Sequence, residues 1–313
     1  MSKFIVSSSP HIRSGETTQR IMLDVIIALL PVAVAGTVIF GWRSLAVIAA
    51  CVLAAVITEF LFNLATRHEQ TVGDLSAVVT GLILALNLHA NMPIWQCVIG
   101  SVFAIAVVKC LFGGLGCNFA NPAATARILL LLSFASTAGS YANPTLSPDT
   151  VSSATPLSQL AAGGEAPSVL TLFLGNYGGA IGETCTLAII IGFLYLVFRK
   201  VIRWEIPTVF ILTVYLLSII ITNDPAGALL YVLSGGVFFG AVFMATDYVT
   251  SPITNMGRVI FAFGCGLLTV LIRFFGTYPE GVSFAILIMN ILSPYIEKWT
   301  EKRPLGGKKN EKA

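Results

Sequence analysis

Charged side chains are scarce in this chain. Asp, Glu, Lys and Arg make up 11 % of its 313 residues, while hydrophobic residues make up 56 %. A soluble globular domain carries about 25 % charged residues, so the composition excludes a single large soluble core. The mean hydropathy of +0.87 and the repeated apolar runs indicate a polytopic membrane protein. The net charge of +3 is small, and no nucleic-acid partner is expected.

The six cysteines lack the spacing of a metal or cluster site. No pair is spaced CxxC, and Cys110 and Cys117 match no familiar zinc or iron–sulfur pattern. Most cysteines lie in apolar segments, where a free thiol behaves as a small hydrophobic side chain. If the chain carries electrons, a group other than its cysteines must hold them. No metal is expected apart from a transported sodium ion.

The pattern of a cleavable signal peptide is also missing, because residues 1–20 (MSKFIVSSSPHIRSGETTQR) are polar and precede the first apolar run. Ten apolar segments follow, several of which reach the ~20 residues that cross a bilayer, whereas three are short. Short or interrupted spans at matching places in two halves are typical of broken helices around a mid-membrane site. The expected segments are 21–42, 44–66, 75–88, 93–112, 128–140, 179–198, 207–222, 228–246, 258–275 and 281–296.

Lysine and arginine are absent from the long stretch between Arg127 and Arg199. If the N-terminus is cytoplasmic, ten spans place most of the chain's Lys and Arg residues on the cytoplasmic side, as the positive-inside rule requires. Only Arg43 and Arg273 then lie near the outer ends of spans. The loop 141–178 is therefore expected on the outer side of the membrane.

Two pairs of segments resemble each other across the chain. LSAVVTGLILALNLHANMP (75–93) resembles LSGGVFFGAVFMATDYVTSP (233–252), and LFGGLGCNFAN resembles FFGTYPEGVSFAI. Because each half has an odd number of spans, such repeats run in opposite directions, as in many transporters. The predicted fold is all-α and polytopic, with about ten transmembrane helices in two inverted five-helix repeats and both termini cytoplasmic. Its parts are an N-terminal segment (1–19), the two repeats (20–140 and 179–297), an outer loop (141–178) and a basic tail (298–313).

The segment KCLFGGLGCNFANPAATAR combines glycines, amides and flanking positive charges. Glycines let backbone approach a flat ligand closely, and asparagines offer both hydrogen-bond donors and acceptors. An ordinary re-entrant turn with anchoring charges explains the segment equally well. The candidate binding residues are Lys109, Gly113, Gly114, Asn118, Asn121 and Arg127.

Three carboxylates lie within or directly after apolar segments: Asp24, Glu59 and Asp247. Ionisable side chains inside a membrane are costly and usually face a cavity or a partner, so these residues are candidates for a cation path. Asp24 could equally lie at headgroup level, and Asp247 could cap the helix that starts near Pro252. Carboxylates suit sodium as a hard cation, but the residues do not separate sodium from a proton.

Two polar segments belong to the outer side in this scheme. GNYGGAIGETCTLAI contains Gly182 and Glu183 at the expected start of the sixth span. The segment can be a glycine-rich helix start with a purely structural role. The alternative is that it lies near a cofactor on the outer side. DTVSSATPLSQL (149–160) is rich in Ser and Thr. Their hydroxyl groups either stabilise a turn or serve as sites of chemical attachment.

DTVSSAT resembles the motif that a flavin transferase modifies, in which the last Thr forms a phosphoester with FMN. Asp149 begins the motif, Ser152 takes its Ser/Thr position, Ala154 matches, and Thr155 becomes the attachment residue. Ser153 stands where the motif usually has Gly. The resemblance therefore implies covalent FMN on Thr155.

Longer segments support this resemblance. KCLFGGLGCNFANPAATAR, GGAIGETCTLAI, FMATDYVTSP and PEGVSFAILIMNILSPYIE together resemble the RnfD subunit of ion-translocating ferredoxin:NAD oxidoreductases and its homologue NqrB. The short polar N-terminus favours RnfD. The resemblance implies a urea-transporter-like fold in a bacterial inner membrane and a second, non-covalent flavin (riboflavin or FMN). Gly113 and Gly114 match positions implicated in the flavin or quinone region of the quinone-reductase relatives.

The implied function is a relay of electrons between the two flavins, coupled to Na+ or H+ translocation during ferredoxin:NAD+ oxidoreduction. The implied partners are a membrane iron–sulfur pair, an outer FMN subunit, a cytoplasmic NAD-binding subunit and the flavin transferase. Lys109 and Arg127 could then stabilise a reduced inner flavin. The alternatives are an NqrB-type subunit of a Na+-pumping NADH:quinone reductase, a passive small-solute channel or transporter, and a scaffold without cofactors.

Overall fold

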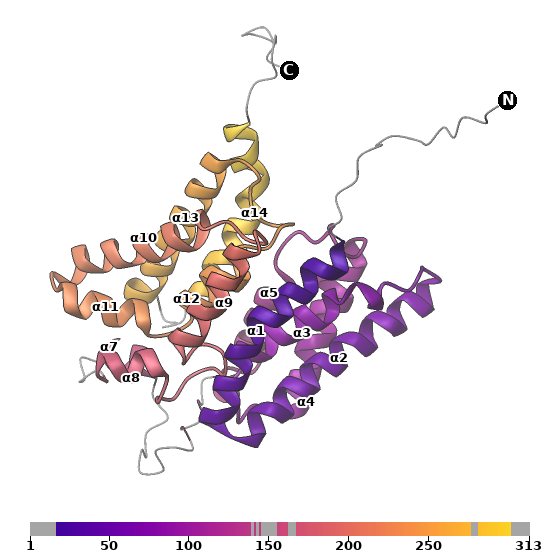
Figure 1. Cartoon of the computed structure of the whole chain (residues 1–313), viewed down its shortest axis with the longest axis horizontal. Helices are drawn as coiled ribbons and strands as arrows, with labels where there is room; N and C mark the ends of the chain where they lie inside the picture. The colour runs from indigo at the N-terminus through magenta and orange to yellow at the C-terminus, as the bar shows by residue number, and fades with distance from the viewer. Residues whose placement is uncertain are drawn as a thin grey trace, which may run out of the picture.

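The computed structural model describes residues 17–138, 141, 144, 155–161, 167–276 and 281–301. Within these ranges the regular elements are all helical, with no strand (Figure 1). Helix α1 begins and α14 ends at one end of the molecule, which we call the terminal end. Helices α7 and α8 lie at the opposite end, the α7 end (Figure 1). The Asp149–Ala154 part of the attachment motif lies outside the described residues.

The first half is built on long apolar helices that flank shorter ones. Gly41 separates its first two helices with a positive φ of 75°, which glycine adopts without steric cost. The elements are α1 (Thr18–Phe40), α2 (Trp42–Thr66), the 3₁₀ turn η1 (Val72–Asp74), α3 (Ser76–Leu86), α4 (Ile94–Val102), the π-helical η2 (Phe103–Lys109), the 3₁₀ turn η3 (Cys110–Phe112), α5 (Pro122–Ser133) and α6 (Ala135–Ala138).

The second half follows two short helices at the α7 end. Its helix α11 is capped by the Asp224 side chain, which accepts hydrogen bonds from two backbone N–H groups, and Pro225 begins it at a position where no N–H is needed. The elements are α7 (Pro156–Ala161), α8 (Val169–Leu174), α9 (Thr186–Phe198), α10 (Glu205–Thr222), α11 (Pro225–Leu233), α12 (Val237–Phe239), the π-helical η4 (Gly240–Met244), α13 (Asn255–Phe275) and α14 (Val282–Thr300).

Within the part of the chain that the structure describes, five helical segments are long and apolar enough to cross a membrane: α1, α2, Ile94–Phe112, α10 and α13. The pair α11 and Val237–Met244 reaches this length only as a span bent by 64°. Helices α3, α5 and α9 are apolar but have 11, 12 and 13 residues, or about 17 to 20 Å at 1.5 Å per residue. The prediction of an all-α polytopic membrane protein is confirmed at this level.

The predicted segment 128–140 is displaced from the helix that forms there. Helix α5 begins at Pro122, because the Asn121 side chain accepts hydrogen bonds from the N–H groups of Ala123 and Ala124 at 3.0 and 3.1 Å. This is an N-cap followed by proline at the first helical position. Arg127 consequently lies inside the helix and is buried.

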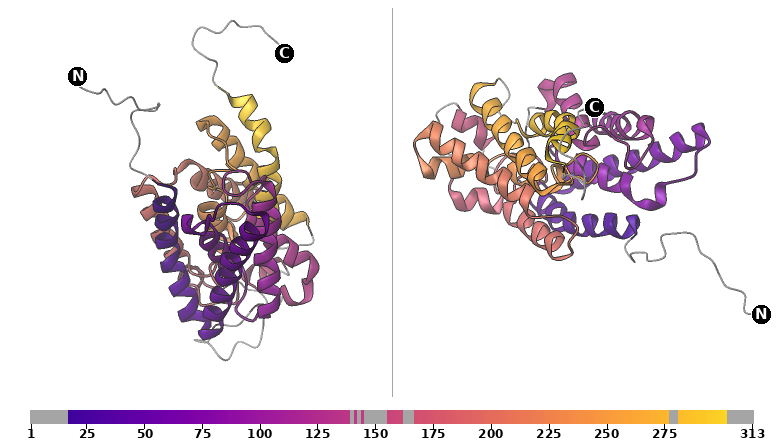
Figure 2. Two further views of the ribbon diagram at one scale, coloured as in Figure 1. Left: turned by 90° about the vertical axis from the view of Figure 1, so that its right-hand side faces the viewer. Right: turned by 90° about the horizontal axis from the view of Figure 1, so that it is seen from above.

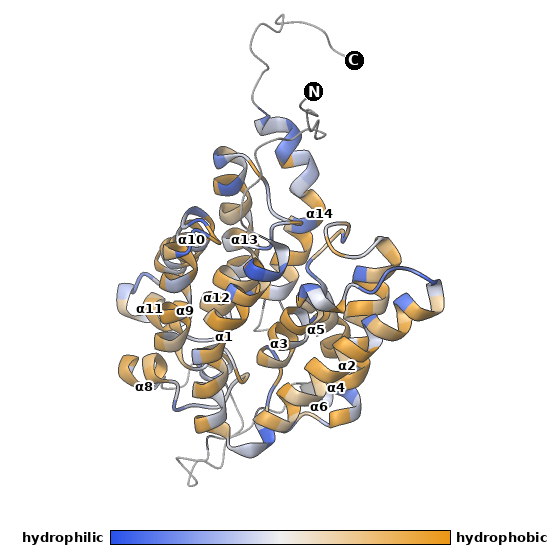
Figure 3. Ribbon diagram, turned by 45° about the vertical axis from the view of Figure 1, so that its right-hand side comes forward, coloured by the Kyte–Doolittle hydropathy of each residue, from blue (hydrophilic) through white to orange (hydrophobic). Residues whose placement is uncertain are grey.

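The two halves lie side by side, with α1–α5 against α9–α14 (Figure 2). Helix α1 packs on α9, and α5 packs on α14, so both halves contribute to the junction. Away from it, α2 exposes large apolar residues such as Leu53, Leu61 and Leu64, and α2 and α4 are coloured predominantly hydrophobic in Figure 3. An outward apolar face with a packed inner face suits a helix that borders lipid.

Candidate functional site: a polar cavity between the two halves

Two interruptions between successive helices, one in each half, border one small cavity. In the first half, residues 87–93 separate α3 from α4; in the second, residues 234–236 separate α11 from α12. Unsatisfied backbone groups are costly inside a membrane. At the first interruption the Gly182 N–H donates to the Leu86 carbonyl at 2.7 Å, so the loop before α9 completes the end of α3.

A larger cavity of about 110 Å³ lies between the halves, near the terminal end. Its walls come from α1, α3, α5, α9 and η4, and from the loops after η3 and η4. Most of the walls are apolar and include Phe243 and Tyr248. A few polar groups in an apolar cleft are the usual composition of a ligand site. The polar lining residues are Ser76, Thr80, Lys109, Asn118, Asn121, Thr246 and Asp247.

Lys109 reaches this cavity from the end of η2 as part of a buried ion pair. Its Nζ lies 2.8 Å from Glu59 Oε1 and donates to Ser76 Oγ at 2.5 Å. The Thr71 hydroxyl also donates to Glu59 Oε1, at 2.8 Å. Both charged residues are almost completely buried, at 2 % exposure for Lys109 and 1 % for Glu59. Pairing is what makes two such charges tolerable in a low-dielectric interior.

Asn121 and Asn118 fix the loop that closes the cavity. Asn121 caps α5 with its oxygen, and its Nδ2 donates to the Met244 carbonyl at 3.2 Å. This contact joins the first half to η4 in the second. Asn118 Nδ2 donates to the Ala120 carbonyl at 3.0 Å. Both asparagines therefore have structural tasks and still line the cavity.

Asp247 follows the bent pair of α11 and Val237–Met244. Its carboxylate accepts hydrogen bonds from neutral groups. Its carboxylate accepts from the Thr250 hydroxyl at 3.2 Å and from the Val249 N–H at 3.4 Å. Loss of water around this half-buried group raises the pKa of the Asp247 carboxyl, while hydrogen bonds from Val249, Thr250 and Asn118 oppose the shift. Asp247 is the cavity carboxylate that has no Lys or Arg partner among the described ion pairs.

Gly113 and Gly114 lie in the turn after η3 and do not line the cavity. Their φ angles are 114° and 89°, in the left-handed region that favours glycine. The Gly114 N–H donates to the Lys109 carbonyl at 3.0 Å. The glycines therefore turn the chain behind Lys109, and their predicted contact with a flavin stays a prediction.

Arg127 and Glu183 form a second buried ion pair, apart from the larger cavity. Arg127 Nη1 donates to Glu183 Oε1, and to Asn87 Oδ1 at 2.5 Å. The prediction grouped Arg127 with Lys109 around one ligand, but the structure places them at two separate ion pairs. Gly182 is required beside this pair, because a Cβ atom there would lie 2.6 Å from Leu86 Cβ.

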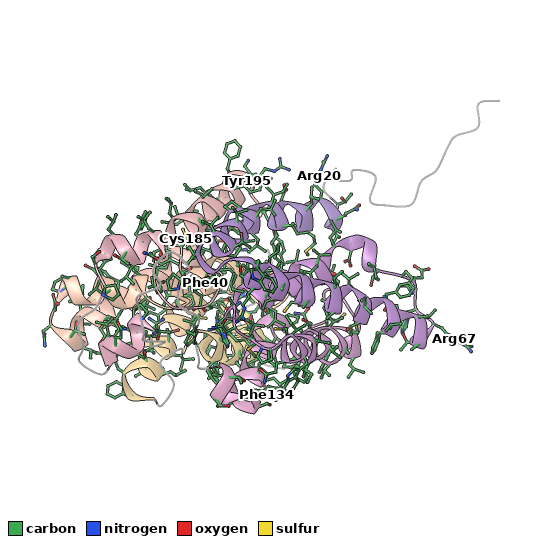
Figure 4. The ribbon with its side chains drawn as sticks, turned by 90° about the horizontal axis from the view of Figure 1, so that it is seen from below. Arg20, Phe40, Arg67, Phe134, Cys185 and Tyr195 are labelled. Carbon is green, nitrogen blue, oxygen red and sulfur yellow. The ribbon has the colours of Figure 1, made fainter. Side chains whose placement is uncertain are left out.

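Asp24 is buried on α1 and pairs with α9. Its carboxylate lies 3.1 Å from Arg199 Nη2 and accepts from the Tyr195 hydroxyl at 2.8 Å. Figure 4 shows Tyr195 beside α1 at the periphery of the molecule. Sequence patterns did not indicate Tyr195 or Arg199, although an arginine at the end of an apolar span is a signal that could have identified a partner for Asp24.

Thr155 precedes α7 and acts as its cap. Its Oγ1 accepts from the Ser158 N–H at 3.2 Å and donates to Ser158 Oγ at the same distance. The residue is 7 % exposed. The following turn packs inward, because Leu157 Cδ2 lies 3.4 Å from the Cβ position of Gly235 at the second helix interruption.

These features define an integral membrane protein in which two helical halves enclose a cavity with polar lining residues. The sequence model of the NQR2, RnfD, RnfE family matches residues 5–306. The chain belongs to this family, and the predicted membership is confirmed.

Similar proteins of this family extend over nearly the whole chain. The D subunit of the Na(+)-translocating ferredoxin:NAD(+) oxidoreductase complex of Acetobacterium woodii is 49 % identical over 98 % of this chain and 96 % of its own length. The D subunit of the proton-translocating ferredoxin:NAD(+) oxidoreductase complex of Clostridium ljungdahlii is 41 % identical over 97 % and 96 %. The D subunit of an ion-translocating oxidoreductase complex of Stutzerimonas stutzeri is 38 % identical over 93 % and 92 %.

Proposed function

We propose that this chain is the D subunit of an Rnf-type ferredoxin:NAD+ oxidoreductase complex and that it couples electron transfer to the movement of Na+ or H+. The observation that carries this proposal is the 49 % identity, over nearly both full lengths, to a subunit of that complex. The family also includes NQR2 proteins. The names of the first two relatives favour ferredoxin and NAD+ over a quinone as the redox partners.

The proposed topology has ten spans in two inverted repeats with both termini cytoplasmic. Each predicted apolar segment overlaps at least one helix, and 228–246 overlaps the bent pair, although some of these helices are short. The shared terminal end of α1 and α14 agrees with an even number of spans (Figure 1). The α7 end, which holds Thr155, then faces outward, and the larger cavity lies toward the cytoplasm.

FMN on Thr155 is the proposed outer cofactor, and a flavin supplies reversible transfer of one or two electrons when bound. Esterification would keep the hydrogen bond from the Ser158 N–H to Thr155 Oγ1, because the ester oxygen remains an acceptor. It would remove the hydroxyl proton that Thr155 donates to Ser158 Oγ. Since Thr155 is 7 % exposed, we expect the flavin transferase to act before α7 docks.

The larger cavity is the proposed site of the second flavin. Apolar walls with Phe243 and Tyr248 suit a flat aromatic ring, and the Asn118 and Asn121 amides suit its polar edge. The volume of about 110 Å³ is below the roughly 300–1,000 Å³ of common ligand sites, so binding requires side chains around the cavity to move apart. Lys109 is the adjacent positive charge.

Asp247 is the proposed cation ligand, because Glu59 and Asp24 are already neutralised by Lys109 and Arg199. Thr246 and Asn118 add neutral oxygens to the same cavity. Oxygen donors of this kind suit Na+. Relatives that translocate sodium and protons both share this chain's sequence closely, so the coupling ion must be measured directly.

The test of the redox role is in-gel flavin fluorescence after denaturation of the complex, produced together with its transferase. A fluorescent band at the mass of this subunit is expected for the wild type and for Ser158→Ala, which keeps the attachment hydroxyl. Thr155→Ala is expected to lose the band. A wild-type subunit without fluorescence, or a Thr155→Ala variant that retains it, would overturn covalent attachment at Thr155.

A further inference from the structure

Arg127 on α5 of the first half pairs with Glu183, which precedes α9 of the second half. Two small cavities of about 20 and 10 Å³ border its side chain. The first also contains His89 and Tyr141, and the second contains Glu183 and Gly236. A polar cavity needs roughly 10–15 Å³ to hold one water molecule, so the first has room for water beside the guanidinium.

Hydrogen bonds continue from Arg127 toward the larger cavity. Arg127 donates to Asn87 Oδ1, and Asn87 Nδ2 lies 3.4 Å from Met244 Sδ. The carbonyl of Met244 accepts from Asn121, which lines the larger cavity. These contacts lead from the small cavities, by way of the Met244 side chain and its backbone carbonyl, to a residue that lines the larger cavity.

The guanidinium is held between the two helix interruptions. Asn87 is the first residue after α3, and Glu183 Oε1 lies 2.5 Å from the Cβ position of Gly236, between α11 and α12. Arg127 itself is on α5. The ion pair thus lies between the end of α3 in the first half and the break between α11 and α12 in the second.

Glu183 does not face both small cavities. Arg127 and Asn87 line both, whereas Glu183 lines the cavity with Gly236 and not the one with His89 and Tyr141. A cation in the latter cavity would meet the guanidinium before the carboxylate. Fixed positive charge in a narrow passage excludes cations, and the effect is strong where the local dielectric constant is low.

We propose that Arg127, held by Glu183 and Asn87, is the barrier that prevents cations from leaking between the small cavities and the larger cavity. Glu183 and Asn87 are positioning residues, since they orient the guanidinium. This inference rests on the proposed role of the chain in cation movement. The inference goes beyond that role by assigning the residue that keeps cation movement coupled to electron transfer.

The test is passive uptake of Na+, and separately of protons, by vesicles that contain the assembled complex and no electron donor. Replacement of Arg127 with Gln removes the charge, and we expect uptake of at least one of the two cations to rise about tenfold or more over wild type. Arg127→Lys keeps the charge and is expected to stay near the wild-type rate. Arg199→Gln is the matched control, because Arg199 also pairs with a carboxylate but lies away from the small cavities.

Assembly is measured in parallel from subunit content and from fluorescence at Thr155, neither of which depends on the barrier. If Arg127→Gln fails to assemble, Arg127→Met combined with Glu183→Met removes both charges and is tested for the same leak. Unchanged uptake of both cations in an assembled variant without the charge would overturn the barrier. The same would follow if Arg127→Lys leaked as much as Arg127→Gln. Loss of fluorescence in Thr155→Ala and ferredoxin-dependent NAD+ reduction would remain as separate tests of the proposed function.

Discussion

Replacement of Glu59 with Gln probes the buried ion pair beside the larger cavity. Lys109 would keep Ser76 as a partner but would lose the carboxylate that lies 2.8 Å from its Nζ. Removal of one member of a buried pair costs about 3–5 kcal/mol, because the other charge stays buried without compensation. At about 2–4 °C per kcal/mol for a large domain, the midpoint of thermal unfolding should fall by roughly 6–20 °C.

The assay is the thermal unfolding of the purified complex in detergent, followed by the fraction of this subunit that stays assembled after heating. Lys109→Met should destabilise the subunit by a similar amount, since Glu59 would then be the unpaired charge. Glu69→Gln, the same substitution at an exposed position, should leave the midpoint unchanged.

The double variant Glu59→Gln with Lys109→Met decides whether the charge pair is the cause. With both charges removed, the desolvation cost disappears, so the double variant should be more stable than either single variant. A double variant whose loss equals the sum of the two single losses would refute the reasoning. Because both residues are paired, we also expect Lys109→Gln to impair assembly, which limits its use as a probe of flavin chemistry.

Two further predictions concern the cavity carboxylate and the loop before α9. Asp247→Asn should abolish electron-driven Na+ or H+ uptake by vesicles while ferredoxin-dependent NAD+ reduction persists. In the wild type, Na+ uptake should decline as the pH falls through the raised pKa of Asp247, since a protonated carboxyl binds sodium weakly. Full uptake in Asp247→Asn would exclude Asp247 as the cation ligand. Gly182→Ala should destabilise the subunit by about 1–3 kcal/mol, because its Cβ would lie 2.6 Å from Leu86 Cβ. Gly73→Ala, with no atom within 4 Å of its Cβ, should unfold at the wild-type temperature, and equal midpoints for the two variants would contradict the packing argument.

The sequence by itself determined the class of the protein, its apolar segments and its family. Hydropathy is a local property, and a run of apolar residues must be buried in lipid or protein whatever its neighbours are. The apolar run 128–140 alone puts the start of α5 too late, whereas Pro122 after Asn121 is a local signal for the helix start that the structure has. The family could be recognised from the order of motifs such as 109–127, and this recognition required no knowledge of how the helices pack.

Only the tertiary structure decided which charges meet. Lys109 and Glu59 are 50 positions apart, Arg127 and Glu183 are 56 apart, and Asn121 and Met244 are 123 apart. Periodicity reports that a side chain is buried, but it does not name the helix that packs against it. Lys109 and Arg127 occupy equivalent places in the sequence, at the two ends of one motif. In the structure they pair with different carboxylates at separate sites, because each buried charge requires its own partner within hydrogen-bonding distance.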